Sequence, residues 1–239
     1  LSGLGGDELL GGYPSFRETA GLLRRARRLA RVPGLAALWA PFARKLDPDR
    51  PKLAGALRHG AASLAGAWAL QRALHLPEEL PGNGRGGPLH DPVLEAWERL
   101  GDGILGSSDG ILEDPWKAVH RLESTIYLKN QLLRDADWAG MAHGVEIRVP
   151  LVDARLRAEL EAAGFEPARS EGKRALVRRL APELPAAIFD RPKTGFQLPV
   201  ADWLEPDPSR GERRVGLQSR RLARLVLEQF GVDGDAGAR

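Results

Sequence analysis

The chain lacks cysteine altogether, and its 239 residues include a single methionine, Met141. The absence of cysteine excludes a disulfide scaffold, a thiol nucleophile and a zinc site built on thiolates. No stretch approaches the ~20 apolar residues that cross a bilayer, so we expect no membrane-spanning segment. The first residues are rich in glycine and do not follow the pattern of a signal peptide. A cytoplasmic protein with no membrane partner is therefore expected.

Lysine is scarce as well, since only six of the 35 basic residues are lysine, and 32 acidic residues leave a net charge of +3. The densest basic cluster, residues 24–28, contains no aromatic residue and lies within a helical pattern. We interpret this cluster as a solvated helix face, so nucleic acid is not the expected partner. A steep salt dependence of affinity would be needed to support nucleic-acid binding.

Alternating runs of β-branched residues are few, and residues 145–152 are the best strand candidate. Helical signals dominate instead. Ser15 and Glu18 have capping-box spacing, Asp114 precedes a proline suited to the first helical turn, and Asp153 precedes a further apolar pattern. The spacing of apolar residues predicts helices over these ranges: 15–32, 35–47, 53–74, 114–126, 153–163, 176–180 and 222–230.

The first stretch that could carry chemistry is Ser2-Gly3-Leu4-Gly5-Gly6-Asp7-Glu8. Its glycines let the backbone approach a ligand, and successive N–H groups in such a turn can cradle an anion. Asp7 offers the hard oxygen ligand that Mg²⁺ prefers when it binds phosphates. A glycine-rich turn with a capping aspartate explains the same residues, and both interpretations stay open. No Gly-Lys-Ser/Thr follows, so the stretch is not a Walker loop.

Two later stretches carry charged residues in unusual surroundings. Glu146 and Arg148 lie two residues apart in an apolar setting, and in an extended chain they would share one face. Lys193 follows a proline and lies two residues before Gly195, so a shaped loop could hold it as a point charge for phosphate oxygens. A structural ion pair and an ordinary surface lysine are the alternatives.

Taken together, these stretches resemble the synthetase domain of the glutamine-hydrolysing asparagine synthetase family. The family pattern Ser-Gly-x-Gly-x-Asp-Glu-x-Phe-Gly-Gly-Tyr appears as SGLGGDELLGGY at residues 2–13, with Leu10 in place of phenylalanine. The pattern Met-Ala-x-x-x-Glu-x-Arg-x-Pro-x-x-Asp appears as MAHGVEIRVPLVD at 141–153. The last appears as KTGFQLP at 193–199, followed by Trp-Leu at 203–204.

The resemblance implies a fold class, namely a mainly α fragment of an α/β, adenine-nucleotide α-hydrolase-like ATP-pyrophosphatase domain. We expect one strand ending at Ser2 and another near 145–150. The implied division is residues 1–204 as the C-terminal part of the synthetase domain and 205–239 as a terminal helix and frayed tail. The chain is then a fragment that begins inside a fold.

The resemblance also implies an activity, ATP-dependent amide formation through an acyl-adenylate by a carbon–nitrogen ligase. The substrates would be aspartate and ammonia from glutamine, with ATP and Mg²⁺ as cofactors. Asp7 would bind the metal, Lys193 would stabilise the charge that develops during adenylation, and Glu146 and Arg148 would shape or brace the acyl site. The implied nucleotide-binding residues are Ser2, Gly3, Leu4, Gly5, Gly6 and Asp7.

Two departures from the family pattern matter. Leu4 stands where well-studied asparagine synthetases carry glutamate and cyclising relatives carry tyrosine, and leucine cannot accept a proton. The pyrophosphate loop and the N-terminal glutaminase of the family are not in the sequence, so we expect both to act as partners of this chain. A related amidotransferase for a sugar acid or natural-product carboxylate, or a non-catalytic helical module, are the alternatives, and a homodimer is left open.

Overall fold

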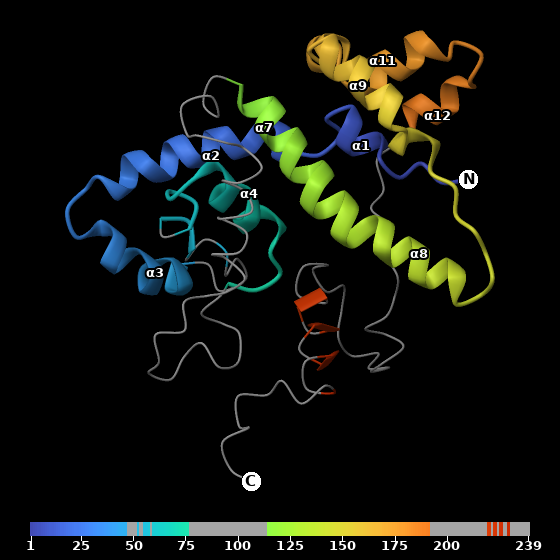
Figure 1. The fold of residues 1–239 in the computed structure, drawn as a ribbon. Helices are drawn as coiled ribbons and strands as arrows, with labels where there is room; N and C mark the ends of the chain where they lie inside the picture. Colours follow the sequence, from blue (N-terminus) through green and yellow to red (C-terminus); the bar gives the residue numbers. More distant parts are fainter. Residues whose placement is uncertain are drawn as a thin grey trace. The chain divides into compact units, whose positions relative to one another are not determined.

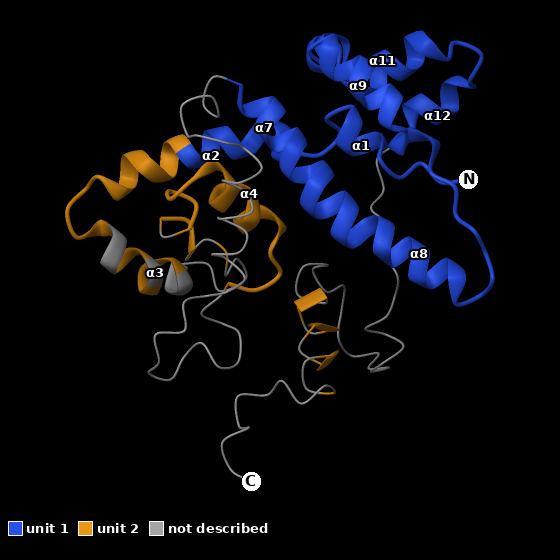
Figure 2. Ribbon diagram, in the orientation of Figure 1, with its two compact units in different colours: residues 1–23, 99–192 blue, residues 24–98, 193–239 orange. Residues whose placement is uncertain are grey.

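The structure is a computed structural model, and the placement of part of the chain is described (Figure 1). The described residues are 1–46, 52, 55–57, 59–76, 114–191, 219, 220, 222, 223, 225, 226 and 229. The chain divides into two compact units (Figure 2). Unit 1 comprises residues 1–23 and 99–192, and unit 2 comprises 24–98 and 193–239.

Among its described residues, unit 1 is helical wherever it has regular structure. It contains the start of α2 (Ser15–Ala30), and its other elements are α1 (Gly6–Leu9), α7 (Pro115–Leu122), η3 (Glu123–Leu132), α8 (Leu133–Met141), η4 (Pro150–Val152), α9 (Ala154–Ala162), α10 (Glu166–Ser170), α11 (Lys173–Leu180) and α12 (Ala186–Asp190). The π-helix η3 joins α7 and α8 into one rod (Figure 1).

An aromatic cluster forms the core of unit 1. The ring of Trp116 on α7 lies 4.9 Å from that of Phe16 and 5.0 Å from that of Phe165, measured between centroids. His120, one turn along α7, lies 4.4 Å from Phe165. Phe165 is 1% exposed and has a φ of 56°, so burial of its ring offsets a backbone conformation that β-carbons disfavour.

Unit 2 contains the end of α2, α3 (Leu35–Leu46), α4 (Leu64–Arg72) and helical residues between 219 and 229. Arg27 on α2 donates to the carbonyls of Ala61 and Ala62, at 3.1 and 3.0 Å, and so ties α2 to the turn before α4. The Ser63 hydroxyl accepts the Gly66 N–H and caps α4. One long helix over 53–74 was expected, but residues 59–62 form turns and the helix begins at Leu64.

The expected strands do not form among the described residues, none of which is assigned to a strand. Residues 145–149 run without regular pairing, and Pro150 starts the 3-10 turn η4. A single backbone hydrogen bond, from the Ser2 N–H to the Arg148 carbonyl at 2.9 Å, joins the two predicted strand positions. One bond is not a ladder, so the helical part of the expected fold class is confirmed and its parallel sheet stays a prediction.

Two of the predicted helix caps are confirmed, and one is wrong. Asp114 accepts the Lys117 N–H at 3.2 Å, and Asp153 accepts the Leu156 N–H at 2.9 Å. Ser15 does not act as a cap. Its hydroxyl donates to the buried Glu123 carboxylate at 2.5 Å, and the Glu18 N–H bonds the Pro14 carbonyl instead. A partner 108 residues away therefore outcompetes the local capping box.

Candidate active site

The glycine-rich loop at the front of the chain is pressed against η4. Gly5 has a φ of 89°, and a β-carbon there would lie 2.8 Å from Val152 Cγ2 and 3.1 Å from the Leu151 carbonyl oxygen. A β-carbon at Gly6 would lie 3.0 Å from Leu151 Cδ1. These glycines are therefore explained by the close approach of η4, through the Leu151 carbonyl and the side chains of Leu151 and Val152, with no ligand required.

Part of the hydrogen-bonding capacity of this loop is used internally. The Ser2 hydroxyl accepts the Leu4 N–H at 3.3 Å, and the Gly3 carbonyl accepts the Gly6 N–H at 3.2 Å. Two of the N–H groups expected to cradle an anion are thus already bonded within the loop. Gly3 faces open space within the described part of the chain, where a β-carbon at this position would meet no atom within 4 Å. The loop therefore has one open side.

Asp7, the predicted metal ligand, lies in the first turn of α1 with 29% of its side chain exposed. Its Oδ1 is 2.6 Å from Nζ of Lys173, a residue 166 positions away. Gly12 lies close to the same carboxylate oxygen, since a β-carbon at Gly12 would lie 1.8 Å from Oδ1. The Gly12 N–H also donates to the Asp7 carbonyl at 2.8 Å. Asp7 is thus in contact with both Lys173 and Gly12 while its side chain remains partly exposed.

Glu8, the next residue, points into the protein instead. Its side chain is 2% exposed and accepts the Tyr13 hydroxyl at 2.8 Å. Burial raises the pKa of the Glu8 carboxyl, and the hydrogen bond from Tyr13 opposes that shift only in part. Burial beside Glu8 likewise raises the pKa of Tyr13. The aspartate of the Asp-Glu pair therefore faces the site, and the glutamate anchors the turn that ends at Tyr13.

The buried side chain of His120 contacts the backbone of α1. Its Nδ1 lies 3.0 Å from the Glu8 carbonyl oxygen, so this nitrogen carries the proton, because a carbonyl can only accept. Its Nε2 lies 3.9 Å from a carboxylate oxygen of Glu161 and has no hydrogen-bond partner among the described residues. Burial lowers the pKa of His120 and favours the neutral ring. His120 therefore serves packing and orientation.

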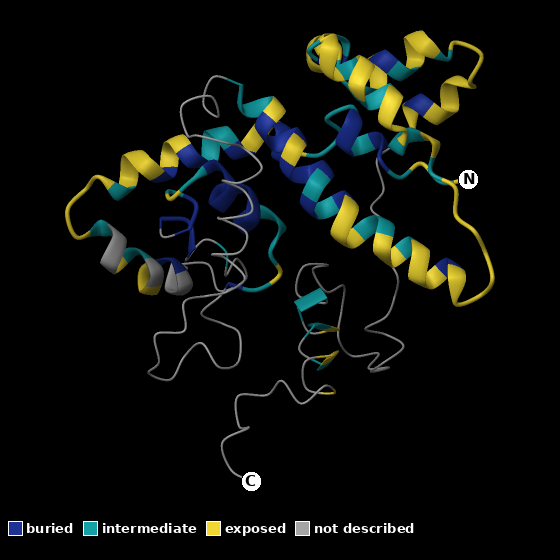
Figure 3. Ribbon diagram, viewed as in Figure 1, coloured by how far each residue is buried: buried dark blue, intermediate teal, exposed yellow. Residues whose placement is uncertain are grey.

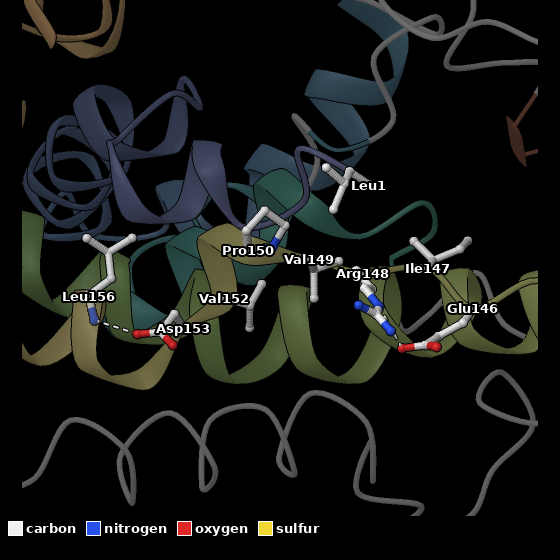
Figure 4. A pocket seen from close by; sticks show the side chains of 9 residues that line it. All are labelled: Leu1, Glu146, Ile147, Arg148, Val149, Pro150, Val152, Asp153 and Leu156. Carbon is white, nitrogen blue, oxygen red and sulfur yellow. Dashed lines mark hydrogen bonds and ion pairs between the residues drawn. The ribbon is translucent and has the colours of Figure 1, made fainter. Parts of the chain in front are cut away.

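Residues 141–153 are called the middle motif here, and the glycine-rich residues 2–6 the front loop. The middle motif lines an open pocket of about 740 Å³ beside the front loop (Figure 4). Glu146 and Arg148 pair through Oε1 and Nε at 3.1 Å, and both side chains are more than two-thirds exposed. The ion pair that the sequence left as an alternative is therefore present, and the buried position suggested by the apolar neighbours in the sequence is wrong. The remaining lining residues, most of them apolar, are Leu1, Ile147, Val149, Pro150, Val152, Asp153 and Leu156.

Within unit 1, the fold thus brings the first two predicted motifs together. The bond from Ser2 to Arg148 places the front loop directly beside the middle motif. Lys193, the predicted residue of the third motif, lies outside the described residues. Lys173 was not predicted as a site residue. No sequence signal was available for it, because the sequence predicted this helix only over 176–180, whereas the helix begins at Lys173.

The side chains of this site suit a metal ion that binds together with phosphates better than a metal ion held by protein side chains alone. Among the described residues, no group of three or more histidine or acidic side chains could hold a metal ion. Mg²⁺ commonly takes one or two carboxylates, with substrate phosphates and water completing its shell. Asp7 is the carboxylate on the open side of α1 and fits that role.

In the described part of the chain, no helix is both long and apolar enough to span a membrane.

Comparison with known proteins agrees with the motifs. A family model described as asparagine synthase matches residues 1–230. The chain is 30% identical over 214 residues to proteins from Mycobacterium bovis and Mycobacterium tuberculosis, each named putative asparagine synthetase, glutamine-hydrolyzing. The alignment covers 85% of this chain and 30% of each relative, so the chain spans less than a third of the relatives' length. No solved structure matches it.

Proposed function

Because the chain belongs to the asparagine synthase family, we propose that it forms part of the active site of an ATP-dependent ligase that converts a carboxylate into an amide. A substrate carboxylate oxygen would attack the α-phosphorus of ATP, and pyrophosphate would leave. Ammonia would then attack the acyl carbon and displace AMP. We further propose that the ammonia comes from glutamine, on a glutaminase segment that acts with this chain together with a pyrophosphate loop, as the family resemblance implies.

The observation that best supports this function is the position of Asp7. The partly exposed carboxylate of Asp7 follows directly after the glycine-rich loop. The backbone of that loop bonds to the middle motif beside an open pocket. Asp7 would hold Mg²⁺, which would neutralise phosphate charge when bound. The loop from Ser2 to Gly6 would lie along the nucleotide, and Lys193 would stabilise the charge that develops during adenylation.

The pocket of the middle motif is the proposed acyl site, with Glu146 and Arg148 at its polar end. The guanidinium of Arg148 can form a bidentate pair with a carboxylate, and Glu146 keeps that guanidinium oriented. Aspartate is the default substrate by family resemblance. Leu4 and the largely apolar lining favour the alternative, a related amidotransferase for a sugar acid or natural-product carboxylate, because no side chain at position 4 can accept the proton of ammonia.

The test is ATP–pyrophosphate exchange by the natural protein with a panel of carboxylic acids that includes aspartate. Exchange with one acid, followed by AMP release on addition of ammonia, supports the ligase and names its substrate. Absence of exchange with every acid would favour a non-catalytic helical module. Lys193→Ala should lower the exchange rate more than the affinity for ATP, and a pure loss of affinity would contradict its transition-state role.

Asp7→Asn should abolish exchange without unfolding the protein. Asp114→Asn is the matched control, since Asp114 is 27% exposed and also pairs closely with a cation, Arg169 at 2.8 Å. Asparagine caps helices as well as aspartate does, so this control keeps α7 intact. Equal loss of exchange in both variants, or unchanged exchange in Asp7→Asn, would overturn the metal-binding role of Asp7.

A further inference from the structure

The segment from the end of α2 through α3, residues 24–46 and called the α2–α3 corner below, combines positive charge with exposed apolar side chains. It contains seven arginine and lysine residues and no aspartate or glutamate. These seven positive charges exceed the net charge of the whole chain, which is +3, so the rest of the chain is net acidic. The α2–α3 corner lies in unit 2 and shares no residue with the candidate active site.

The arginines of α2 lie on its solvent side. Arg24 and Arg28 are exposed one turn apart, and Arg31 is exposed just after the helix ends. Another face of α2 is buried through Leu23 and Ala26, which are 2% and 3% exposed. The buried face explains why this segment is helical, but any good helix former would serve at the exposed positions. The fold therefore does not require the charge of the exposed face.

Large apolar side chains are exposed where α2 passes into α3. Leu29 and Val32 are 43% and 50% exposed, and the Val32 N–H bonds the Leu29 carbonyl at 3.0 Å. On α3, Leu38 and Phe42 are 69% and 56% exposed and share one helix face, because they lie four residues apart. Figure 3 shows the turn between the two helices as exposed. Apolar residues that are exposed singly are ordinary, but several of them beside a group of arginines indicate an interaction surface.

We propose that the α2–α3 corner is a peripheral binding surface for an anionic lipid bilayer. The arginines contact lipid phosphates, and the apolar side chains enter the boundary between head groups and acyl chains. Helices that present leucine and phenylalanine beside basic residues bind membranes in this way, and each basic residue near an anionic surface adds to the affinity. The sequence predicted no membrane partner because it contains no spanning segment, and binding at the membrane surface needs none.

A nucleic acid and a solvated helix face are the alternatives. The phosphates of a nucleic acid would bind the arginines, but its backbone offers no apolar surroundings for Leu38 and Phe42. A solvated helix face explains the arginines and gains nothing from exposing those two side chains. A membrane surface uses the charge and the apolar side chains together. The two kinds of side chain must therefore be tested separately.

The first experiment measures co-sedimentation of the natural protein with vesicles of phosphatidylcholine, alone or with about a third phosphatidylserine. The parent protein should bind the anionic vesicles and not the neutral ones. Arg24→Gln with Arg28→Gln should weaken binding about fivefold for each charge removed. Arg121→Gln with Arg155→Gln is the matched control, because both residues are exposed on helices of unit 1, and it should bind as the parent does. Equal weakening by the two double variants, or no vesicle binding by the parent, would overturn the proposal.

The second experiment removes the apolar side chains and keeps every charge. Leu38→Gln with Phe42→Gln should weaken binding to the anionic vesicles about tenfold, because less apolar surface leaves water. Leu180→Gln with Ile188→Gln is the matched control, since these residues are 66% and 58% exposed in unit 1, and it should have no effect. If the two variants bound alike, charge alone would hold the surface to anions, and the proposal would be wrong.

A third measurement addresses nucleic acid directly, with a single-stranded RNA oligonucleotide in place of vesicles. Binding of this RNA by the parent protein without binding of anionic vesicles would assign the α2–α3 corner to nucleic acid and overturn the proposal. All of the substituted side chains are exposed, so every variant should unfold at the urea concentration of the parent protein. The proposal is independent of the proposed ligase function, and ATP–pyrophosphate exchange should be unchanged in the arginine variant.

Discussion

The two motifs that the fold brings together, the front motif at residues 2–13 and the middle motif at 141–153, differ in how far they are buried (Figure 3). In the front motif, Gly5, Gly6, Glu8 and Leu9 are buried, and the remaining residues from Leu4 to Tyr13 are partly so. In the middle motif, residues 141–148 are all exposed. The front motif is therefore fixed by packing. Residues 141–148 of the middle motif form a surface segment, whereas its last part, η4, packs against the front loop.

This difference affects how each motif can be studied. A substitution in the front motif disturbs stability and any bound ligand together, so each loss of function there needs a folding control. A substitution in the middle motif reports on the pocket directly.

The largest difference is expected for apolar truncation. Leu9, in α1, is 5% exposed, and Leu9→Ala should destabilise the protein by about 2–5 kcal/mol because it leaves a cavity. Val145 is 54% exposed, and Val145→Ala should change stability by less than about 0.5 kcal/mol. Urea unfolding of the two variants measures both values. Similar losses would mean that the middle motif is packed as firmly as the front one.

A smaller effect is expected for added bulk at glycine. Gly12→Ala places a methyl group against the Asp7 carboxylate and should cost about 1–3 kcal/mol. Gly3→Ala is the control within the same motif, because its methyl group would meet nothing within 4 Å, and it should leave the unfolding midpoint unchanged. If both variants unfolded alike, the contact between Gly12 and Asp7 would not exist in solution.

The contrast also separates what the sequence could predict from what it could not. The caps at Asp114 and Asp153 were predictable because a side chain and an N–H three residues away decide them. Two other bonds, from Ser15 to Glu123 and from Lys173 to Asp7, join residues more than a hundred positions apart. No local sequence pattern predicts such bonds. The motifs themselves pointed to Asp7, Glu146 and Arg148. The burial of these side chains depends on tertiary packing, and Glu146 and Arg148 are exposed although most residues around them in the sequence are apolar.

The next effect concerns pH and involves Glu8. Because burial raises its pKa above the ordinary 4.5, Glu8 contributes most stability below pH 4.5 and loses it as the pH rises through the folded-state pKa. Glu8→Gln keeps the acceptor for Tyr13 and removes the charge. Its stability relative to the parent protein should therefore improve between pH 4.5 and pH 7, by less than the change seen for Gly12→Ala.

The control for this measurement is Glu146→Gln in the exposed middle motif. Glu146 is 71% exposed, so this variant shows how the same change behaves at a surface glutamate under the same conditions. Urea midpoints measured at several pH values compare the two glutamates directly. A flat profile for Glu8→Gln would show that its carboxyl is solvated in solution, and the burial of the front motif would then be in doubt.

The smallest effect should come from the ion pair of the middle motif. Glu146 and Arg148 are 3.1 Å apart, but their exposure limits the coupling energy in a double-mutant cycle on stability to about 0.2–1 kcal/mol. Salt at 1 M should remove most of that coupling, because exposed charges are screened. The same cycle measured on binding of the acyl substrate should give a larger coupling, since a carboxylate held by Arg148 needs Glu146 to orient the guanidinium. If the two coupling energies are equal, the pair only braces the surface, and the pocket beside it is not where the acyl group binds.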